Sequence, residues 1–344
     1  MKTLLIVTQV VDHRDDNLGF FHRWLEKFSE QGNLIVIANR VGEARLPANV
    51  KVYSLGKERG YGRLRRFFIY RWLLLQLLWK VDGIFYHMCP EYVLAAAFCP
   101  KLFRKKTALW YVHKNVDWKL RWAERLVDKV FTASLESFRL PSSKVSIIGH
   151  GIDMDWFQYT DARPEKPIKL LVAGRIAPVK DLRTMILALA KVNGLIAEKL
   201  ELDIVGDPIL AADRKYAESL RTLVKELGIE SQVHFRGGTV YEAMPDIYRS
   251  HHWLLHASQT GSLDKAVLEA LACGVIVFTS SEAYDKVEAA IVHYRAGHAQ
   301  ELAEKMAELY NGKKQFDVRS SAVWVRSHYG LDKLVQKIID WYVE

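Results

Sequence analysis

The chain has 344 residues, of which 50% are hydrophobic and 26% charged, a globular composition long enough for two domains. Three cysteines without metal-ligand spacing argue against a disulfide framework and fit a reducing cytoplasm. The net charge of +9 is uneven, because residues 1–150 carry +12 and residues 151–344 carry −3. We therefore expect the first part to face an anionic partner, whether nucleic acid, anionic lipid or a phosphorylated small molecule.

Apolar strand-like runs alternate with helical patterns through the first half. The first run is interpreted as a strand rather than a signal peptide, because the charged "DHRDD" follows it. Alternation of this kind predicts parallel strands joined by crossover helices. The expected strands lie at 2–10, 33–39, 50–55, 81–87, 107–112, 129–134 and 144–150, and the expected helices at 18–32 and 63–80.

A charged, proline-containing stretch at 160–170 is the best linker candidate, and the alternation restarts after it. The pattern predicts an α/β protein of two Rossmann-like, doubly wound domains facing across a cleft, with ligands at the carboxyl ends of the strands. The predicted domains are 1–160 on the acceptor side, 166–328 on the donor side, and a helix at 329–344 that packs back on the first domain.

The stretch "HASQTGSLDKAVLEALACG" runs from His256 to Gly274 and turns from small polar residues into an apolar helical pattern. Ser262, preceded by Gly261, is the expected N-cap, so the helix is expected to start at Leu263. The first amides of a helix make a seat for phosphate. The alternative is that Asp264 neutralises the helix dipole and nothing binds there.

Glu269 is the single acid in the middle of this apolar helix. It could pair with Lys265 four residues earlier, although Lys before Glu is the weaker order. Its apolar neighbours make simple solvation less convincing. A carboxylate held at a cleft could instead accept two hydrogen bonds from a vicinal diol such as a ribose.

A second candidate site is "VAGRIAPVKDL", where a strand ends at Gly174 and a short loop precedes a helix. Arg175 and Lys180 flank that loop. Two cations beside a strand end are suited to clamping a diphosphate, and arginine can do so with two hydrogen bonds. The alternative is a pair of solvated loop cations.

Four segments occur in the order and approximate spacing of family 4 glycosyltransferases, which the chain resembles over nearly its whole length: "GHGIDMDWF", "AGRIAPVKD", "VHFRGG" and the stretch from His256. The resemblance implies the two-domain GT-B fold and retention of anomeric configuration. It implies that Arg175 and Lys180 hold the donor diphosphate and that Glu269 binds the ribose. The donor-binding set so implied is Gly174, Arg175, Lys180, Gly261, Ser262, Leu263, Asp264, Lys265 and Glu269.

One position departs from that family's usual pattern. The family commonly has a second glutamate eight residues before the ribose-binding one, contacting the donor sugar, and Gly261 stands there. The residues that follow read Ser262-Leu263-Asp264 in place of Gly-Phe-Gly. The sequence looks like a variant subgroup, in which Asp264 or Lys265 is the candidate contact to the sugar.

The first half offers three acceptor-side candidates. Gly19 lies between the first strand and helix, where resembling enzymes place a loop near the donor phosphate and acceptor. His113 follows a strand, and those enzymes often have a catalytic histidine near the reacting sugar there. The alternative for His113 is a structural histidine, and His87 is a weaker candidate of the same kind.

No metal and no cofactor is expected. "DMD" at Asp153–Asp155 resembles a metal motif of another glycosyltransferase class, but its context matches a family 4 segment that binds no metal. Arg63, Arg65 and Arg66 stand at the electrostatically wrong end of a helix, where an anionic membrane surface would compensate them. Because that helix is apolar almost all round, a buried crossover helix is the favoured interpretation.

The sequence therefore predicts a cytoplasmic glycosyltransferase that uses a UDP- or GDP-linked sugar, with the inner face of the membrane as a candidate location. A glycan, lipid-linked or polysaccharide-precursor hydroxyl would accept the sugar. The alternatives are a nucleotide-sugar epimerase or hydrolase on the same fold, or a non-catalytic two-lobed sugar-binding protein. Nucleic-acid binding is not expected, because the basic half lacks the aromatic–basic motifs of known modules.

Overall fold

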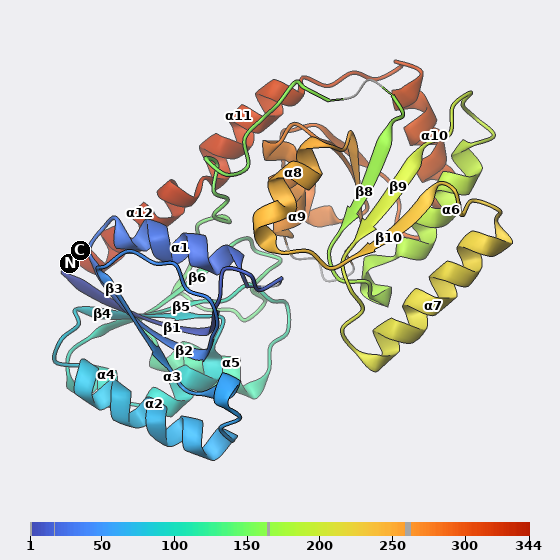
Figure 1. The fold of residues 1–344 in the computed structure, drawn as a ribbon. Helices are drawn as coiled ribbons and strands as arrows, with labels where there is room; N and C mark the ends of the chain where they lie inside the picture. Colours follow the sequence, from blue (N-terminus) through green and yellow to red (C-terminus); the bar gives the residue numbers. More distant parts are fainter. Residues whose placement is uncertain (1, 17, 164–165, 259–262) are drawn as a thin grey trace. The chain divides into compact units, whose positions relative to one another are not determined.

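The computed structural model of the chain describes residues 2–16, 18–163, 166–258 and 263–344. They form two compact units, each built on its own sheet (Figure 1). Unit 1 comprises Met1–Asp153, Val240–Glu242 and Tyr329–Glu344, and unit 2 comprises Met154–Thr239 and Ala243–His328. Every pairing within the two sheets is parallel. The predicted α/β class with two Rossmann-like domains is confirmed.

Unit 1 has a seven-stranded sheet among the described residues, in the order β3-β2-β1-β4-β5-β6-β7. The direction of winding reverses between β1 and β4, the place where doubly wound sheets bind ligands. The strands are β1 Thr3–Val11, β2 Asn33–Val41, β3 Val50–Ser54, β4 Gly83–His87, β5 Lys106–Trp110, β6 Lys129–Thr132 and β7 Val145–Ile147.

Helices cover both faces of this sheet, because its central strands are apolar on both sides (Figure 1). One face packs against α1 Phe20–Ser29 and α12 Leu331–Val343. The other face packs against helices that the connections between the strands provide. They are α2 Arg63–Leu77, α3 Pro90–Ala96, α4 Cys99–Leu102 and α5 Trp118–Leu126, and a short turn η1 Lys57–Arg59 precedes α2.

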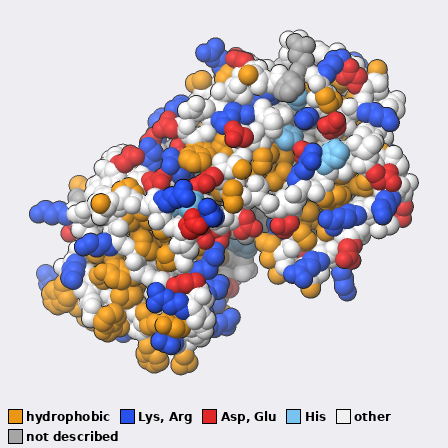
Figure 2. All heavy atoms as spheres, in the orientation of Figure 1, with side chains coloured by type: hydrophobic (Ala, Val, Ile, Leu, Met, Phe, Trp, Pro, Cys, Tyr) orange, Lys and Arg blue, Asp and Glu red, His pale blue; other side chains and the backbone are white. Residues whose placement is uncertain are grey.

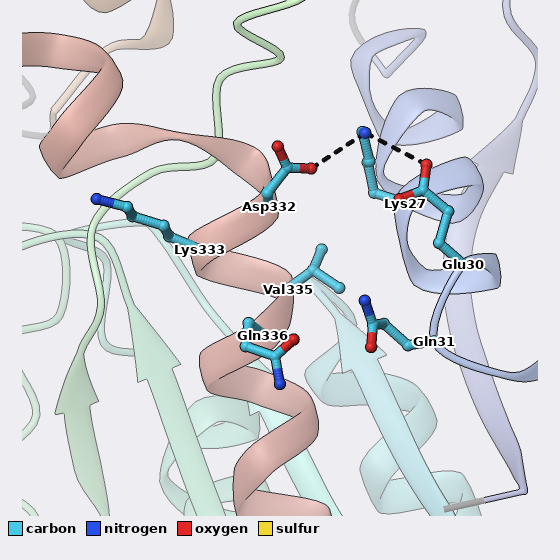
Figure 3. Close-up of a pocket in the computed structure, with 7 residues that line it drawn as sticks. All are labelled: Lys27, Glu30, Gln31, Asp332, Lys333, Val335 and Gln336. Carbon is cyan, nitrogen blue, oxygen red and sulfur yellow. Dashed lines mark ion pairs between the residues drawn. The ribbon is translucent and has the colours of Figure 1, made fainter. Parts of the chain in front are cut away.

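The C-terminal helix α12 is tied to this sheet by its last turn. The Tyr342 hydroxyl donates to the Ile84 carbonyl at 2.6 Å, and its ring lies where a Cβ on Gly83 would come within 2.5 Å. Lys27 of α1 pairs with Asp332 of α12 at 3.1 Å and with Glu30 at 3.2 Å, beside a hollow between the two helices (Figure 3). Glycine at 83 therefore makes room for the returning helix.

The helix from residue 63 is a crossover helix, as expected, but the expectation that it is buried is wrong for its outer face. α2 buries Tyr70, Leu73, Leu74 and Leu77 against the sheet. Its outer face carries large apolar side chains in water, among them Phe68 at 64% and Trp72 at 58% exposure. The helix is apolar on two faces, and the sheet covers only one of them.

Unit 2 has a six-stranded sheet among the described residues, in the order β10-β9-β8-β11-β12-β13. Winding reverses between β8 and β11. The strands are β8 Lys169–Ala173, β9 Glu201–Val205, β10 Val233–Gly237, β11 Trp253–His256, β12 Ile276–Thr279 and β13 Ile291–His293. The ligand position expected from this topology is thus the carboxyl ends of β8 and β11.

The helices of unit 2 also lie on both faces of its sheet (Figure 1). The main apolar core joins the sheet to α6 Leu182–Val192, α7 Ala211–Glu226 and α10 Ala299–Tyr310. On the opposite face α8 Met244–Arg249 packs beside α9 Lys265–Ala272. The remaining elements of unit 2 are α11 Val318–Tyr329 and the turns η2 Pro178–Lys180 and η4 Glu282–Tyr284, while most of the turn η3 Tyr241–Ala243 belongs to unit 1.

Candidate functional site

The loop after β8 forms one side of the candidate site in unit 2. Gly174 has φ of 127°, and a Cβ on Gly206 would lie 2.0 Å from the Gly174 carbonyl oxygen. Two neighbouring strand ends therefore approach as closely as glycine permits. The chain then passes through Arg175 and η2, which ends at Lys180, before Asp181 caps α6 by accepting from the Thr184 amide.

The other side of the site is the start of α9, which differs from the sequence prediction. The helix begins at Lys265 with Asp264 as its N-cap, rather than at Leu263; the expected N-cap Ser262 and Gly261 lie outside the described residues. The hydroxyl of Tyr284 accepts from the Asp264 amide at 2.6 Å and donates to the Asp264 carbonyl at 2.9 Å. These two bonds hold Asp264 in an extended conformation, so the helix starts after it.

The carboxylate of Asp264 joins the two sides of the site. It pairs with the Lys180 ammonium and lies 2.9 Å from the His256 Nε2, whose Nδ1 is 2.9 Å from the Thr279 hydroxyl. Burial alone would raise the pKa of Asp264, but the hydrogen bond to His256 and the charge of Lys180 outweigh it and hold that pKa well below 3.8. Asp264 is thus an ionised residue at neutral pH.

Asp264 makes no side-chain hydrogen bond to the amides of α9. The alternative in which it simply neutralises the helix dipole therefore describes only part of its environment, because the carboxylate forms an ion pair with Lys180 and lies within hydrogen-bond distance of His256. His256 is itself buried, and burial lowers its pKa while Asp264 acts in the opposite direction.

Glu269 is buried, with 4% of the residue exposed, one turn into α9. Its Oε2 accepts a hydrogen bond from the Tyr248 hydroxyl of α8 at 3.0 Å. Burial, followed by the charge of Glu269, raises the pKa of Tyr248 well above 10 and keeps it a donor. Lys265 is half-buried, and burial lowers its pKa while Glu269 and Asp264 oppose that shift. A buried carboxylate in an apolar helix is thereby stabilised by a neighbouring helix.

Arg175 lies on the same loop as Lys180, as the sequence predicted, but with a different partner. Its Nε is 3.9 Å from the carboxylate of Asp213, a buried residue in the first turn of α7 that also accepts from the Leu210 amide. Its side chain is 39% exposed, so the guanidinium remains accessible. The site therefore combines an accessible arginine, a lysine shared with an aspartate, and a buried glutamate.

The three acceptor-side candidates of unit 1 have different environments. Gly19 is the N-cap of α1, where a Cβ would come within 2.4 Å of the Asp15 carbonyl oxygen. His87 is a core residue, because its ring stacks on Phe21 at 3.7 Å and its Nδ1 lies 3.1 Å from the Thr8 hydroxyl. His113 is exposed just after β5. Their roles toward an acceptor stay predictions.

Metal-binding geometry is not found in the part of the chain that the structure describes: no cluster of three or more His, Cys, Asp or Glu side chains could hold an ion. Asp153 of the "DMD" motif instead pairs with Arg23 at 2.6 Å inside unit 1. Likewise, within those residues no helix has the length and apolarity needed to cross a membrane.

Sequence reasoning missed three residues that organise the site: Tyr248, His256 as a partner of Asp264, and Tyr284. The place of His256 at a strand end, like that of Gly174, was an available signal. The tyrosines gave no signal, because each reaches the site from a separate element far along the chain.

Comparisons with known proteins give a family match and a curated relative. Residues 158–321 match the model of the family described as glycosyl transferases group 1. D-inositol 3-phosphate glycosyltransferase 2 of Catenulispora acidiphila is 30% identical over 172 residues, which cover 45% of this chain. The chain spans only 39% of the length of that curated relative.

Two solved structures share the fold across the chain. Anabaena Alr3699/HepE in complex with UDP is 16% identical, with a TM-score of 0.78 and coverage of 100% of both chains. Sucrose-phosphate synthase from Thermosynechococcus elongatus is 13% identical, with a TM-score of 0.76 and coverage of 100% of this chain and 98% of the other. The fold is therefore GT-B.

Proposed function

We propose that the protein transfers a sugar from a nucleoside diphosphate sugar to a hydroxyl acceptor. The observation that carries the proposal is the pairing of Lys180 with Asp264 across the point where strand order reverses in unit 2. This contact brings the cationic loop after β8 next to the start of α9, at the position where doubly wound sheets bind ligands. The UDP complex of the structurally similar Anabaena protein supports the same class of donor.

Each residue has a role in this proposal. Arg175, Lys180 and the first amides of α9 stabilise the negative charge that develops on the leaving diphosphate. Glu269 accepts hydrogen bonds from the ribose hydroxyls while Tyr248 holds its carboxylate in place. In line with the family 4 resemblance, we propose that transfer retains the anomeric configuration and needs no metal ion. The acceptor is a glycan, lipid-linked or polysaccharide-precursor hydroxyl, with His113 and Gly19 on its side.

Asp264 is a residue of this proposed site at which the chain departs from the usual family 4 pattern. A carboxylate beside a diphosphate seat opposes binding of the anion, unless it contributes a contact of its own. In the sequence, Asp264 follows by three residues the position where the family 4 pattern has a sugar-binding glutamate. We propose that it accepts a hydrogen bond from a hydroxyl of the donor sugar while Lys180 serves both Asp264 and the diphosphate.

The test is calorimetric titration and thermal shift of the full chain with UDP, GDP and ADP and with their glucose conjugates. A ligand that binds only the native state raises the melting temperature. One nucleotide should bind, and Glu269→Gln should weaken it about tenfold, which corresponds to about 1.4 kcal/mol. No binding of any of the three nucleotides would refute the proposal. Product analysis with and without a hydroxyl acceptor then distinguishes transfer from hydrolysis or epimerisation.

A further inference from the structure

The outer face of α2 carries an apolar stripe with regular helical spacing. Leu64, Phe68, Trp72 and Leu75 follow one another at intervals of three or four residues, and Trp79 continues the series just beyond the helix. Such spacing places them on one side of the helix. All five are exposed, from 43% for Leu75 to 78% for Trp79. A surface helix usually carries polar side chains on the face that contacts water, whereas the outer face of α2 is apolar.

A second element extends this surface. Phe98 immediately precedes α4 and is 64% exposed, and Leu102 is the last residue of α4 and is 79% exposed. The ring of Trp79 meets that of Phe103, just after α4, at a centroid distance of 4.6 Å. The stripe of α2 and the apolar residues of α4 therefore join at this contact. Figure 2 shows hydrophobic side chains gathered over the α2 side of unit 1, with lysines and arginines among them.

The two segments that form this surface carry charge of one sign. The sequence contains no aspartate or glutamate from Arg59 to Val81, nor from Tyr92 to Val116. Arg63 and Arg65 are exposed at the start of α2, and Lys101 and Arg104 are exposed at α4. Arginines at a helix N-terminus are unfavourable toward the helix dipole. Their position is understandable if an anion outside the protein lies beside them.

We propose that this surface, formed by α2 and α4, docks the protein on the face of a lipid bilayer rich in anionic headgroups. Tryptophan and phenylalanine partition into the bilayer interface, and arginine and lysine bind the headgroups. The fifteen residues of α2 are about 22 Å long, shorter than the apolar thickness of a bilayer of about 30 Å. The helix therefore lies along the interface rather than crossing it.

A second copy of the chain is a poorer occupant of the same surface. A two-fold dimer brings the same patch of each copy together. Arg63, Arg65, Lys101 and Arg104 would then face their own counterparts without a carboxylate from these two segments to balance them. Like charges brought together in this way oppose association. An anionic lipid surface satisfies both the apolar and the cationic groups.

The test is flotation of the full chain with vesicles of phosphatidylcholine alone and of equimolar phosphatidylcholine and phosphatidylglycerol. The protein should float with the anionic vesicles, weakly with the neutral ones, and less as salt is added. The double variant Phe68→Ser/Trp72→Ser should lower the fraction of protein bound to vesicles at least tenfold, because it removes two aromatic side chains from the bilayer interface. Arg63→Gln/Lys101→Gln should lower it about fivefold per cation removed.

The matched control is Leu210→Ser/Val323→Ser, which removes two apolar side chains of similar exposure from unit 2. It should float like the wild type. Far-ultraviolet circular dichroism and thermal melting of every variant check that each one folds. Absence of flotation with anionic vesicles, or flotation unchanged in Phe68→Ser/Trp72→Ser, would overturn the proposal. The proposal would also be overturned if sedimentation velocity showed a dimer for the wild type and a monomer for Phe68→Ser/Trp72→Ser, with vesicle binding the same in both. None of these outcomes depends on sugar transfer.

Discussion

Lys180 and Asp264 form an ion pair although 84 residues separate them in the chain. Lys180 ends the turn after β8, and Asp264 is the N-cap of α9 after β11. The pair thus connects the two strand ends between which a doubly wound sheet binds its ligand. Because Asp264 also contacts His256, a lysine proposed to hold the donor diphosphate already serves a second, negatively charged group.

Removing the charge of Asp264 should therefore strengthen the binding of the nucleotide alone. Asp264→Asn should tighten UDP binding about fivefold, because one negative charge near the phosphates is worth about 1 kcal/mol at the protein surface. Binding of the sugar conjugate should not tighten, since the sugar hydroxyl loses its charged acceptor. Calorimetric titration with UDP and UDP-glucose measures both. Equal gains for the two ligands would argue against a contact between Asp264 and the sugar.

Removing Lys180 should cost stability as well as binding. Lys180→Ala removes the ammonium that pairs with the half-buried Asp264 carboxylate, and we expect a loss of about 2 kcal/mol in the free energy of unfolding. Lys180→Ala/Asp264→Asn should recover most of that loss without restoring UDP affinity. Urea denaturation monitored by fluorescence provides the free energies. A double variant as unstable as Lys180→Ala would show that the loss does not come from the uncompensated Asp264 carboxylate.

Arg175 should contribute to binding with little effect on stability, since its side chain is 39% exposed and its contact with Asp213 is long. Arg175→Ala should weaken UDP binding at least tenfold, because a bidentate guanidinium–phosphate contact is lost. The matched control is Arg236→Ala, which removes an exposed arginine paired with Asp203 at 3.0 Å elsewhere in unit 2. Equal effects of the two substitutions on UDP affinity would contradict the assignment of Arg175.

His256 should make the stability of the protein depend on pH. Burial lowers its pKa below 6.5, so below that pH the unfolded chain binds a proton that native His256 resists. Stability therefore falls as pH decreases from about 6.5, a window in which Asp264 stays ionised. His256→Asn should flatten this slope by up to about 1 kcal/mol per pH unit, with His293 contributing part of the remainder.

Denaturation at a series of pH values from neutral to 5 measures that slope. The control His298→Asn changes an exposed histidine and should reproduce the wild-type profile. A His256→Asn profile parallel to that of the wild type would mean that His256 takes up its proton as readily in the native state as in the unfolded chain.

Gly83 should be intolerant of a side chain, because the ring of Tyr342 lies 2.5 Å from the position of its Cβ. Gly83→Ala should lower the free energy of unfolding by about 2 kcal/mol, the usual cost of overpacking. Gly194→Ala, whose Cβ would meet only the Lys191 carbonyl oxygen at 3.6 Å, is the control and should be nearly neutral. A neutral Gly83→Ala would show that α12 can move away from the sheet without cost.

The sequence by itself determined the two parallel sheets and the loop that carries Arg175 and Lys180. Both are encoded locally. Buried parallel strands appear in the sequence as short apolar runs. The glycine just after β8 indicates a tight turn from its own backbone preference, without help from the rest of the chain. The apolar environment of Glu269 was likewise legible from its neighbours in the helix.

Tertiary structure alone decided which groups meet. The helix α9 starts at Lys265 because the hydroxyl of Tyr284, 20 residues further along the chain, forms hydrogen bonds with the amide and the carbonyl of Asp264. Tyr248 became the partner of Glu269 because α8 packs against α9. For α2, the apolar pattern is present on two sides of the helix, and a pattern of hydrophobicity cannot indicate which side the sheet will cover. Periodicity is a property of one segment, whereas burial and pairing depend on what the rest of the chain brings to it.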